Sequence, residues 1–441
     1  MESHTQRTII NMKKIFATAI AALLLCTAAI AQNYNVLEEV KADRLKAAGM
    51  EGAYRFEDYA LTPAPKGYRP FYISHYGRHG SRYAWTSRAY TEVGNTLSEA
   101  KEAGNLTAFG ESFLQRYLDF CDVAIANTGD LVDLGVGQHT RLAADMVRNF
   151  PKVFAGNKRV DALSSVSGRC IVSMAAFTTS LQKQAPKLDI HVKSNHLGMG
   201  IVAPPEAPKG YVRHFAGEGT DSLQREKLGQ FILRKVDVDG IMGHIFKDPK
   251  AVKHTGGTTD FLYYLYMFMG NYPNYSDPAL FADVLTDEQF AQLWETFNYD
   301  SYLTDVTARY EMIPLLEDIV SKAGIAIVNH DTAADLRFGH DYVLEAFIAL
   351  LNLDGFGTTP KNADEVKYWF QSYRICKATT LQFVFYGSRS GDRGILFKIL
   401  WNGKEATIPA LEPVTGPYYR WDDFRAFATR IMAEHPEILK P

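Results

Sequence analysis

Short apolar runs alternate with longer segments of helical periodicity over the first part of the chain. The run 71–76, Phe-Tyr-Ile-Ser-His-Tyr, is rich in β-prone residues and predicts a buried strand. Alternation returns at 159–165, which predicts a second strand, and 170–184 predicts the helix after it. Other helices are predicted at 34–48, 90–103, 106–128 and 134–150. Strands that alternate with helices indicate an α/β fold, with functional loops at the strand ends.

The pattern changes between residues 185 and 320, where helical segments dominate. The predicted elements there are a strand at 191–202 and helices at 223–246, 258–269 and 287–297. Beyond them, the predicted elements are strands at 335–339, 381–386 and 395–401 and a buried helix at 342–351. The sequence therefore predicts an α/β core made of residues 32–184 and 321–441, with residues 185–320 as a mainly helical insertion.

The N-terminal segment has the pattern of an export signal. A basic pair, Lys13-Lys14, precedes an apolar stretch from 15 to 30, and Ala29-Ile30-Ala31 provides small residues for cleavage. The stretch is short for a membrane span, and polar residues follow it. We therefore predict that residues 1–31 are a signal peptide. The mature protein is expected in the periplasm, on the cell surface or outside the cell, without a membrane span.

Composition narrows the class of protein. The 441 residues are 46% hydrophobic and 22% charged, which is typical of a soluble globular protein long enough for two lobes. A net charge of −3 argues against nucleic acid binding, which requires a broad basic surface. After residue 31 the cysteines are Cys121, Cys170 and Cys376, a set that fits neither a disulfide framework nor a zinc site. Buried thiols are expected, with at most one bridge.

The most informative motif is Arg78-His79-Gly80-Ser81-Arg82, just after the predicted strand 71–76. A neutral imidazole can attack phosphorus, and each guanidinium can hold a phosphate through two parallel hydrogen bonds. Gly80 has no Cβ, so the backbone can pass close to a bound oxyanion. The alternative is a solvated basic turn whose histidine is satisfied by backbone groups. The motif favours a phosphate-transfer site with His79 as the nucleophile.

Two further motifs supply groups that such a site still needs. Gly168-Arg169-Cys170 offers a third arginine at a predicted strand-to-helix junction, where backbone N–H groups also favour an anion. The alternative is a surface arginine at a helix start. His340-Asp341 precedes the predicted helix 342–351, and its carboxylic acid can protonate a leaving alkoxide. The alternative is an ordinary N-cap, and Asp331 is a rival for the donor role.

Together these motifs resemble the histidine acid phosphatases, also called the branch 2 histidine phosphatases. The resemblance covers about residues 50–430. Its pieces, in the family's order, are Arg78 to Arg82, Leu134-Gly135 with Gln138, Ser165 to Arg169 with Ser173, and Phe338 to Asp341. The resemblance implies a phosphoglycerate-mutase-like α/β core sheet flanked by helices, with a mainly helical inserted domain.

The resemblance also implies a mechanism. His79 attacks phosphorus to form a phosphohistidine while Asp341 protonates the leaving alcohol, and the family pattern favours Asp341 over Asp331. The residues implied to hold the phosphate oxygens are Arg78, Arg82, Arg169 and His340. Because guanidinium groups supply the positive charge, no metal and no other cofactor is expected.

The subgroup within the family stays open. This chain resembles the inositol polyphosphate phosphatases in having Arg-His-Gly-Ser-Arg-Tyr followed by aromatic residues. Those proteins commonly have His-Ala-Glu where this chain has His340-Asp341, which is the form of phytases and acid phosphatases. Many members also place a proline soon after the second arginine, where this chain has Tyr83-Ala84-Trp85. An inositol polyphosphate such as phytate is the predicted substrate. Candidate cations for its other phosphates are Arg88, Arg141, Lys209, Arg213, His214, Lys253 and His254.

Several functions remain in competition at this point. The leading prediction is an exported phosphomonoesterase that acts as a monomer on a small phosphate ester, with a general acid phosphatase for sugar phosphates as its close alternative. A phosphotransferase or mutase is less suited to an exported protein. A phosphate-binding protein without catalysis needs neither His79 nor Asp341. In a structural cell-surface protein the basic cluster would be accidental.

Overall fold

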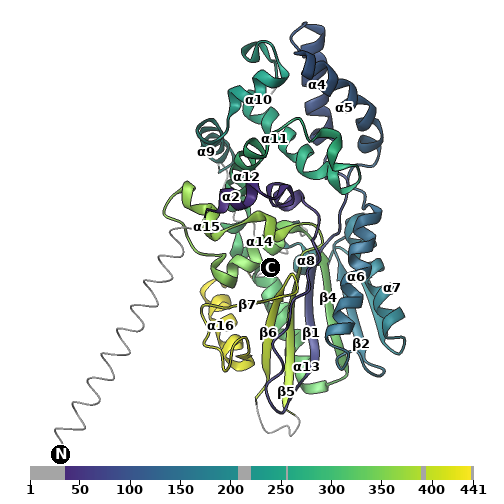
Figure 1. The fold of residues 1–441 in the computed structure, drawn as a ribbon. Coiled ribbons are helices and arrows are strands. Elements are labelled where there is room, and N and C mark those ends of the chain that lie inside the picture. The colour runs from purple at the N-terminus through teal and green to yellow at the C-terminus, as the bar shows by residue number, and fades with distance from the viewer. Residues whose placement is uncertain (1–34, 207–219, 255–256, 389–393, 439–441) are drawn as a thin grey trace, which may run out of the picture.

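An eight-stranded mixed sheet forms the centre of the computed structural model, which describes residues 35–206, 220–254, 257–388 and 394–438 (Figure 1). Its strand order is β3-β2-β4-β1-β5-β6-β7, with β8 paired to β6. The strands β3, β2, β4 and β1 run parallel, and the pairs from β1 to β5 onward are antiparallel. The strands are β1 (Tyr68–Arg78), β2 (Arg159–Ser164), β3 (Asp189–Ser194), β4 (Thr332–Gly339), β5 (Thr380–Ser388), β6 (Leu396–Trp401), β7 (Lys404–Ala406) and β8 (Tyr419–Arg420).

The carboxyl ends of β1, β2 and β4 meet at one edge of the sheet. The register pairs Arg78 of β1 with Gly339 of β4, and Ser164 of β2 with Phe338 of β4. Parallel strands carry their carboxyl ends at the same edge, so the loops that follow them leave the sheet side by side. The motifs at 78–82, 165–169 and 340–341 therefore emerge together.

Helices cover both faces of the sheet. On one face, α6 (Asp133–Asn149) and α7 (Gly168–Gln184) share a hydrophobic core with the strands. Every residue of β4 is buried, as expected for a parallel strand that is covered on both sides. The helices of the other face are α8 (Met199–Val202), α13 (Ile313–Asn329), α14 (Asp341–Leu350) and α16 (Trp421–Glu434).

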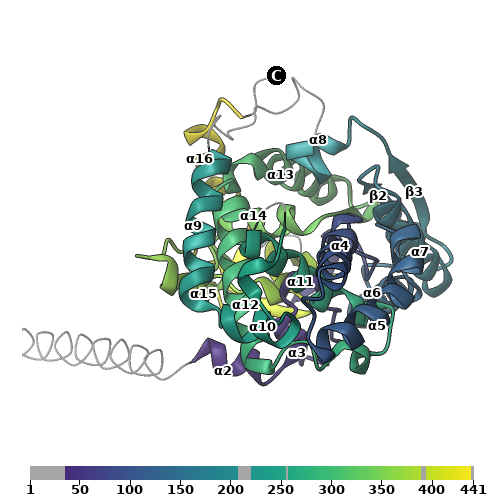
Figure 2. The ribbon, with the colours of Figure 1, turned by 90° about the horizontal axis from the view of Figure 1, so that it is seen from above.

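A helical layer, here called the cap, lies above the carboxyl edge of the sheet (Figure 1) and covers it when the molecule is seen from above (Figure 2). Its hydrophobic core is separate and rich in aromatic rings, including Phe268, Phe281 and Trp294. The cap takes helices from both sides of residue 185, where the sequence predicts a domain boundary. Its helices are α2 (Val36–Lys41), α3 (Arg44–Ala47), α4 (Arg88–Glu102), α5 (Ala108–Ala126), α9 (Thr220–Lys235), α10 (Val238–Ile245), α11 (Gly257–Asn271) and α12 (Asp287–Ser301), with the short α15 (Val366–Trp369) beside α12.

The predicted fold class, an α/β core with a helical domain, is confirmed. The strand predicted at 71–76 is the middle of β1, and the helices predicted at 90–103 and 134–150 correspond closely to α4 and α6. The strands predicted at 159–165 and 335–339 correspond to β2 and β4. Hydrophobic periodicity was sufficient here because each element buries a regular set of positions.

The single strand predicted over 191–202 is wrong beyond Ser194. β3 ends there, and the Oδ1 of Asn195 accepts the N–H of Gly198 at 2.8 Å. This side chain stabilises a turn that leads into α8 instead of continuing the strand.

Two predicted helices are each interrupted by an aspartate. Asp237 caps α10 by accepting the N–H of Gly240 at 3.0 Å, so the segment 223–246 forms α9 and α10. Asp43 caps α3 by accepting the N–H of Leu45 at 3.0 Å, which divides the segment 34–48. In both cases a local side-chain hydrogen bond to the backbone prevails over helical periodicity.

Some predictions lie outside the described residues, namely the signal peptide 1–31 and the candidate cations Lys209, Arg213 and His214. In the described ranges, the chain has no helix that is long and apolar enough to cross a membrane. The described cysteines, Cys121, Cys170 and Cys376, form no disulfide.

Two buried histidines make the stability of the fold sensitive to acid. His75 in β1 and His139 in α6 are both packed against Phe177 and Phe338. Burial lowers the pKa of His75 to about 3 and the pKa of His139 to about 4. Below pH ~6.5 the unfolded chain therefore binds protons at positions that stay neutral in the folded chain.

We expect the free energy of unfolding to fall as the pH drops below about 6.5, by about 1.4 kcal/mol per histidine and pH unit. Urea denaturation at about pH 7 and about pH 5 measures this change. The variant His75→Leu should lose less stability between the two pH values than the wild type. An equal loss in both proteins would contradict the assignment to His75.

Candidate functional site

The loop 78–82 lies in close backbone contact with the first turn of α6. A Cβ on Gly80 would lie 2.6 Å from the Cα of Gly135, and a Cβ on Gly135 would lie 2.3 Å from the carbonyl oxygen of Ser81. Both distances are impossible for a side chain, so glycine is required at both positions for the loop and the helix to approach. The Leu134-Gly135 motif thus determines where the loop sits.

Three hydrogen bonds complete the anchoring of this loop. The N–H of Ser81 donates to Oε1 of Gln138 at 2.8 Å, and the N–H of Gly80 donates to Oγ of Ser173 at 3.0 Å. From the other side, Oγ of Ser81 donates to Oδ1 of Asn274 at 2.7 Å. The loop is therefore held by α6, α7 and a segment of the cap together.

His79 presents one nitrogen of a buried, neutral ring. The residue is 1% exposed, and its Nδ1 donates to the carbonyl oxygen of Gly80 at 2.9 Å, because a carbonyl can only accept. That bond leaves the lone pair on Nε2, which lies 3.5 Å from Nε of Arg82. Burial lowers the pKa of His79 well below 6.5, and Arg82, Arg78 and Arg169 lower it further. Nε2 is therefore unprotonated and accepts a long hydrogen bond from Arg82, and an unprotonated imidazole nitrogen is the form that can attack an electrophile.

Arg78, the last residue of β1, and Asp341, the first residue of α14, form an ion pair. The guanidinium is fully buried, and its Nη1 donates to the carbonyl oxygens of Met50 and Ile375, each at 2.6 Å. Its Nη2 contacts Oδ2 of Asp341, while Oδ1 of Asp341 accepts the N–H of Tyr342 at 3.0 Å. Backbone groups thus position both partners.

Asp341 is negatively charged in this arrangement. Burial acts to raise its pKa, but Arg78, Lys377 and Arg82 hold that pKa well below the usual value of an aspartate. The carboxylate must therefore gain a proton before it can act as an acid. An anion that binds Arg78 weakens the pairing that keeps Asp341 ionised, so anion binding favours its protonation.

Arg169 and His340 form the opposite side of the site. Arg169 lies in the first turn of α7, and its Nη2 is 3.4 Å from Nδ1 of His340. Nε2 of His340 is 3.0 Å from Oγ of Ser165, and the ring centroids of His340 and His79 are 5.8 Å apart. Burial, followed by the charge of Arg169, lowers the pKa of His340 to about 3. His340 is therefore a neutral hydrogen-bonding group.

The structure brings together all the residues that the sequence singles out for the site, namely Arg78, His79, Arg82, Arg169, His340 and Asp341. The rival acid Asp331 is elsewhere. It precedes β4, whose eight residues separate it from His340 by about 25 Å. Asp331 therefore cannot serve the same site.

Two buried charged residues at the site, Lys377 and Glu51, belong to no motif that can be recognised in the sequence. Lys377 is fully buried just before β5, and its Nζ lies 2.7 Å from Oε2 of Glu51. Oε1 of Glu51 lies 3.8 Å from Nη2 of Arg82. Burial acts to raise the pKa of Glu51, but Lys377, Arg82 and Arg78 bring it down to about 2. A lone lysine and a lone glutamate 326 residues apart match no motif, so sequence inspection misses this pair.

We expect Lys377→Met to lower the free energy of unfolding by about 3–5 kcal/mol, because Glu51 would stay buried without its closest cation. Urea denaturation at neutral pH measures the change. The double variant Glu51→Gln/Lys377→Met should recover most of the loss, since it leaves no uncompensated charge. A loss below about 1 kcal/mol in the single variant would contradict this account.

Of the other cations considered from sequence, Arg88, Arg141 and His254 have local partners. Arg88 pairs with Glu92 at 2.8 Å, and His254 lies 3.4 Å from the same carboxylate. The guanidinium of Arg141 lies 4.1 Å from the centre of the Phe56 ring. These contacts involve residues outside the loop 78–82.

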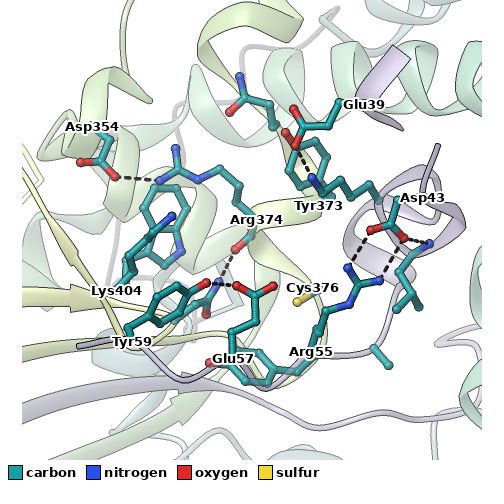
Figure 3. Close-up of a pocket in the computed structure, with 17 residues that line it drawn as sticks. Glu39, Asp43, Arg55, Glu57, Tyr59, Asp354, Tyr373, Arg374, Cys376 and Lys404 are labelled. Carbon is teal, nitrogen blue, oxygen red and sulfur yellow. Dashed lines mark hydrogen bonds and ion pairs between the residues drawn. The ribbon is translucent and has the colours of Figure 1, made fainter. Parts of the chain in front are cut away.

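A cavity of about 430 Å³ lies behind the site, lined in part by Tyr54, Arg55 and Arg374 (Figure 3). Its arginines are paired, Arg55 with Asp43 and Arg374 with Asp354, each at 2.8 Å. Neighbouring acids thus neutralise both arginines of the cavity. Cys376 lines this cavity, and its two neighbours in the chain, Ile375 and Lys377, contact Arg78 and Glu51 at the site.

No protein-family model matches the chain, and no curated protein matches its sequence significantly. Solved structures match it in fold. The multiple inositol polyphosphate phosphatase of Bifidobacterium longum, in complex with inositol hexasulfate, has a TM-score of 0.70 at 16% identity, covering 87% of this chain and 97% of that one.

Two phytases match as well. The phytase of D. castellii has a TM-score of 0.65 at 16% identity, covering 93% of this chain and 89% of that one. The phytase of Hafnia alvei, in complex with tartrate, has a TM-score of 0.54 at 13% identity, covering 83% and 98%. The chain therefore has the fold of these phosphatases, which is the fold that the resemblance to the histidine acid phosphatases implies.

Proposed function

We propose that the chain is a phosphomonoester hydrolase of the histidine acid phosphatase type, which works through a phosphohistidine intermediate. The observation that carries this proposal is the unprotonated Nε2 of the neutral His79, which is surrounded by Arg78, Arg82 and Arg169. Asp341 forms an ion pair with Arg78. The fold shared with phytases and an inositol polyphosphate phosphatase supports it.

In the first step, Nε2 of His79 attacks phosphorus and the bond from phosphorus to the ester oxygen breaks. The guanidinium groups and His340 hold the equatorial oxygens, where charge must be offset as the bonds rearrange. The bound phosphate competes with Asp341 for Arg78, so that Asp341 takes up a proton from solvent, and this proton passes to the leaving alkoxide.

In the second step, water attacks the phosphohistidine. Asp341, now a carboxylate, takes a proton from this water, the bond from phosphorus to Nε2 breaks, and inorganic phosphate leaves. The hydrogen bond from Nδ1 of His79 to Gly80 keeps the ring in one orientation through both steps and stabilises its positive charge while it is phosphorylated. His79 returns to its neutral form.

An inositol polyphosphate is the proposed substrate, with sugar phosphates as the alternative. The proposal is supported by the resemblance in the loop 78–82 and by solved neighbours that are phytases. The pattern of residues 1–31 supports export. Because arginines supply the charge around the phosphate, the reaction is proposed to need no metal.

The test uses the purified protein without residues 1–31, assayed on inositol hexakisphosphate and on glucose 1-phosphate, with and without EDTA. We expect a higher kcat/KM for inositol hexakisphosphate and no effect of EDTA. Comparable or faster turnover of glucose 1-phosphate would reject the substrate proposal. Loss of activity in EDTA would reject the metal-free mechanism, and phosphate binding without hydrolysis would favour a binding protein.

A further inference from the structure

A pair of acids, the buried Glu345 and the partly buried Asp305, lies one helical turn from Asp341. Glu345 is four positions after Asp341 in α14, so the two side chains share a face of the helix. Glu345 is 0% exposed. Asp305 faces it from the π-helical turn η6 (Tyr302–Val306), which packs against α14. Neither acid has a part in the steps proposed above.

The carboxyl group of Glu345 has no ordinary donor. Across the described ranges, no N–H or hydroxyl group forms a hydrogen bond to either of its oxygens. Its partner is the side chain of Asp305. Two carboxyl groups form a hydrogen bond only when one of them carries a proton. A buried carboxylate without a donor is costly, so the pair holds a proton.

The surrounding charges determine when this proton is lost. Burial raises the pKa of Asp305 to about 7, opposed by its hydrogen bond with Glu345 and supported by the charge of Asp341. Burial and Asp305 raise the pKa of Glu345 well above its usual value. The pair therefore gains negative charge as the pH rises through neutral.

Other charges face the pair from each neighbouring element. Arg78 of β1 is the cation that opposes the rise in the pKa of Glu345. Asp300 of α12 and Glu311 of η7 (Arg309–Met312) act on Asp305 in the same direction as Asp341. The cation of η10 (Ser372–Ile375), Arg374, is instead paired with Asp354 at 2.8 Å.

We propose that Asp305 and Glu345 form a protonation switch for anion binding at the site of His79. When the pair is protonated, Asp341 and Glu51 are the acids that oppose the positive charge of Arg78 and its neighbours, and the pair adds no negative charge. When the pair is ionised, its negative charge lowers the affinity of the site for a dianion. This role rests on the proposed function, since it assumes that the site of His79 binds phosphate. Asp305 also lines a cavity of about 220 Å³, which gives its proton a way to exchange with solvent.

The test measures the dissociation constant of sulfate, which keeps both charges throughout, at about pH 6 and about pH 8. In the wild type we expect affinity to be about 3–10-fold weaker at the higher pH. The neutral double variant Asp305→Asn/Glu345→Gln should change by less than about twofold and keep the affinity seen at low pH. Asp239→Asn, which removes an exposed carboxylate in the first turn of α10, is the control and should keep the wild-type loss.

Infrared spectroscopy of the wild type provides a second measurement if the double variant does not fold. A protonated carboxyl should absorb at low pH, weaken as the pH rises, and be reduced in Glu345→Gln, where Asp305 is the member of the pair left to carry a proton. Each of three results would overturn the proposal. These are a wild-type sulfate affinity that does not change with pH, a double variant that behaves like the wild type, and the absence of the carboxyl band from the wild type. Sulfate is not hydrolysed, so a protein without phosphatase activity would refute the proposed function and still give a sulfate result for the pair.

Discussion

His79→Ala is expected to lower kcat for p-nitrophenyl phosphate by about 10⁴-fold or more, because alanine removes the atom that bonds to phosphorus. The loss should fall on kcat, since Arg78, Arg82 and Arg169 remain to hold the phosphate. Steady-state assays in the presence of EDTA, with equal amounts of wild type and variant, measure both constants. The affinity for inorganic phosphate should change by less than about threefold, because the ring of His79 is neutral.

His191→Ala is the matched control for this experiment. His191 lies on the exposed edge strand β3 and contacts Asp189 at 2.8 Å, so its loss should leave kcat unchanged. Unchanged hydrolysis in His79→Ala would remove the proposed nucleophile. If wild type and variant both bind phosphate but neither hydrolyses the ester, the protein is a phosphate-binding protein.

Asp341→Asn is expected to slow hydrolysis of inositol hexakisphosphate by about 10²–10⁴-fold, because an alkoxide needs a proton to leave. The kcat for p-nitrophenyl phosphate should fall by about tenfold or less, since nitrophenolate can leave without a proton. The ratio of kcat on the two substrates is therefore the quantity to compare. It is insensitive to a variant that is only partly folded, because both substrates are measured on one preparation.

Two controls separate proton donation from structural damage. Asp341→Asn removes the charged partner of the buried Arg78, so its free energy of unfolding has to be measured beside its kinetics. Asp331→Asn changes the rival acid at the other end of β4 and should leave kcat unchanged on both substrates. An equal loss of kcat on both substrates in Asp341→Asn would count against a donor role.

Local pattern was enough to predict the strands and loops that carry the site. Apolar and aromatic residues dominate the segment 71–76 because β1 is covered on both faces, and the motif 78–82 follows directly where the strand ends. His340 and Asp341 were predictable for the same reason, because they join a buried strand to an apolar helix. Capping side chains such as Asn195 and Asp237 were missed, since one local hydrogen bond there prevails over periodicity.

Sequence by itself was enough to predict the α/β class, and it singled out the loop 78–82 and His340-Asp341 as candidates for an anion site, because these depend on residues that are neighbours in the chain. The resemblance already favoured Asp341 over Asp331, and the tertiary structure places Asp341 beside Arg78 and Asp331 at the other end of β4. Only the tertiary structure paired Lys377 with Glu51 and Asp305 with Glu345. The physical reason is that burial and charge act through space. A single ionisable residue far along the chain has an ordinary pKa and no recognisable pattern until folding places another charge beside it.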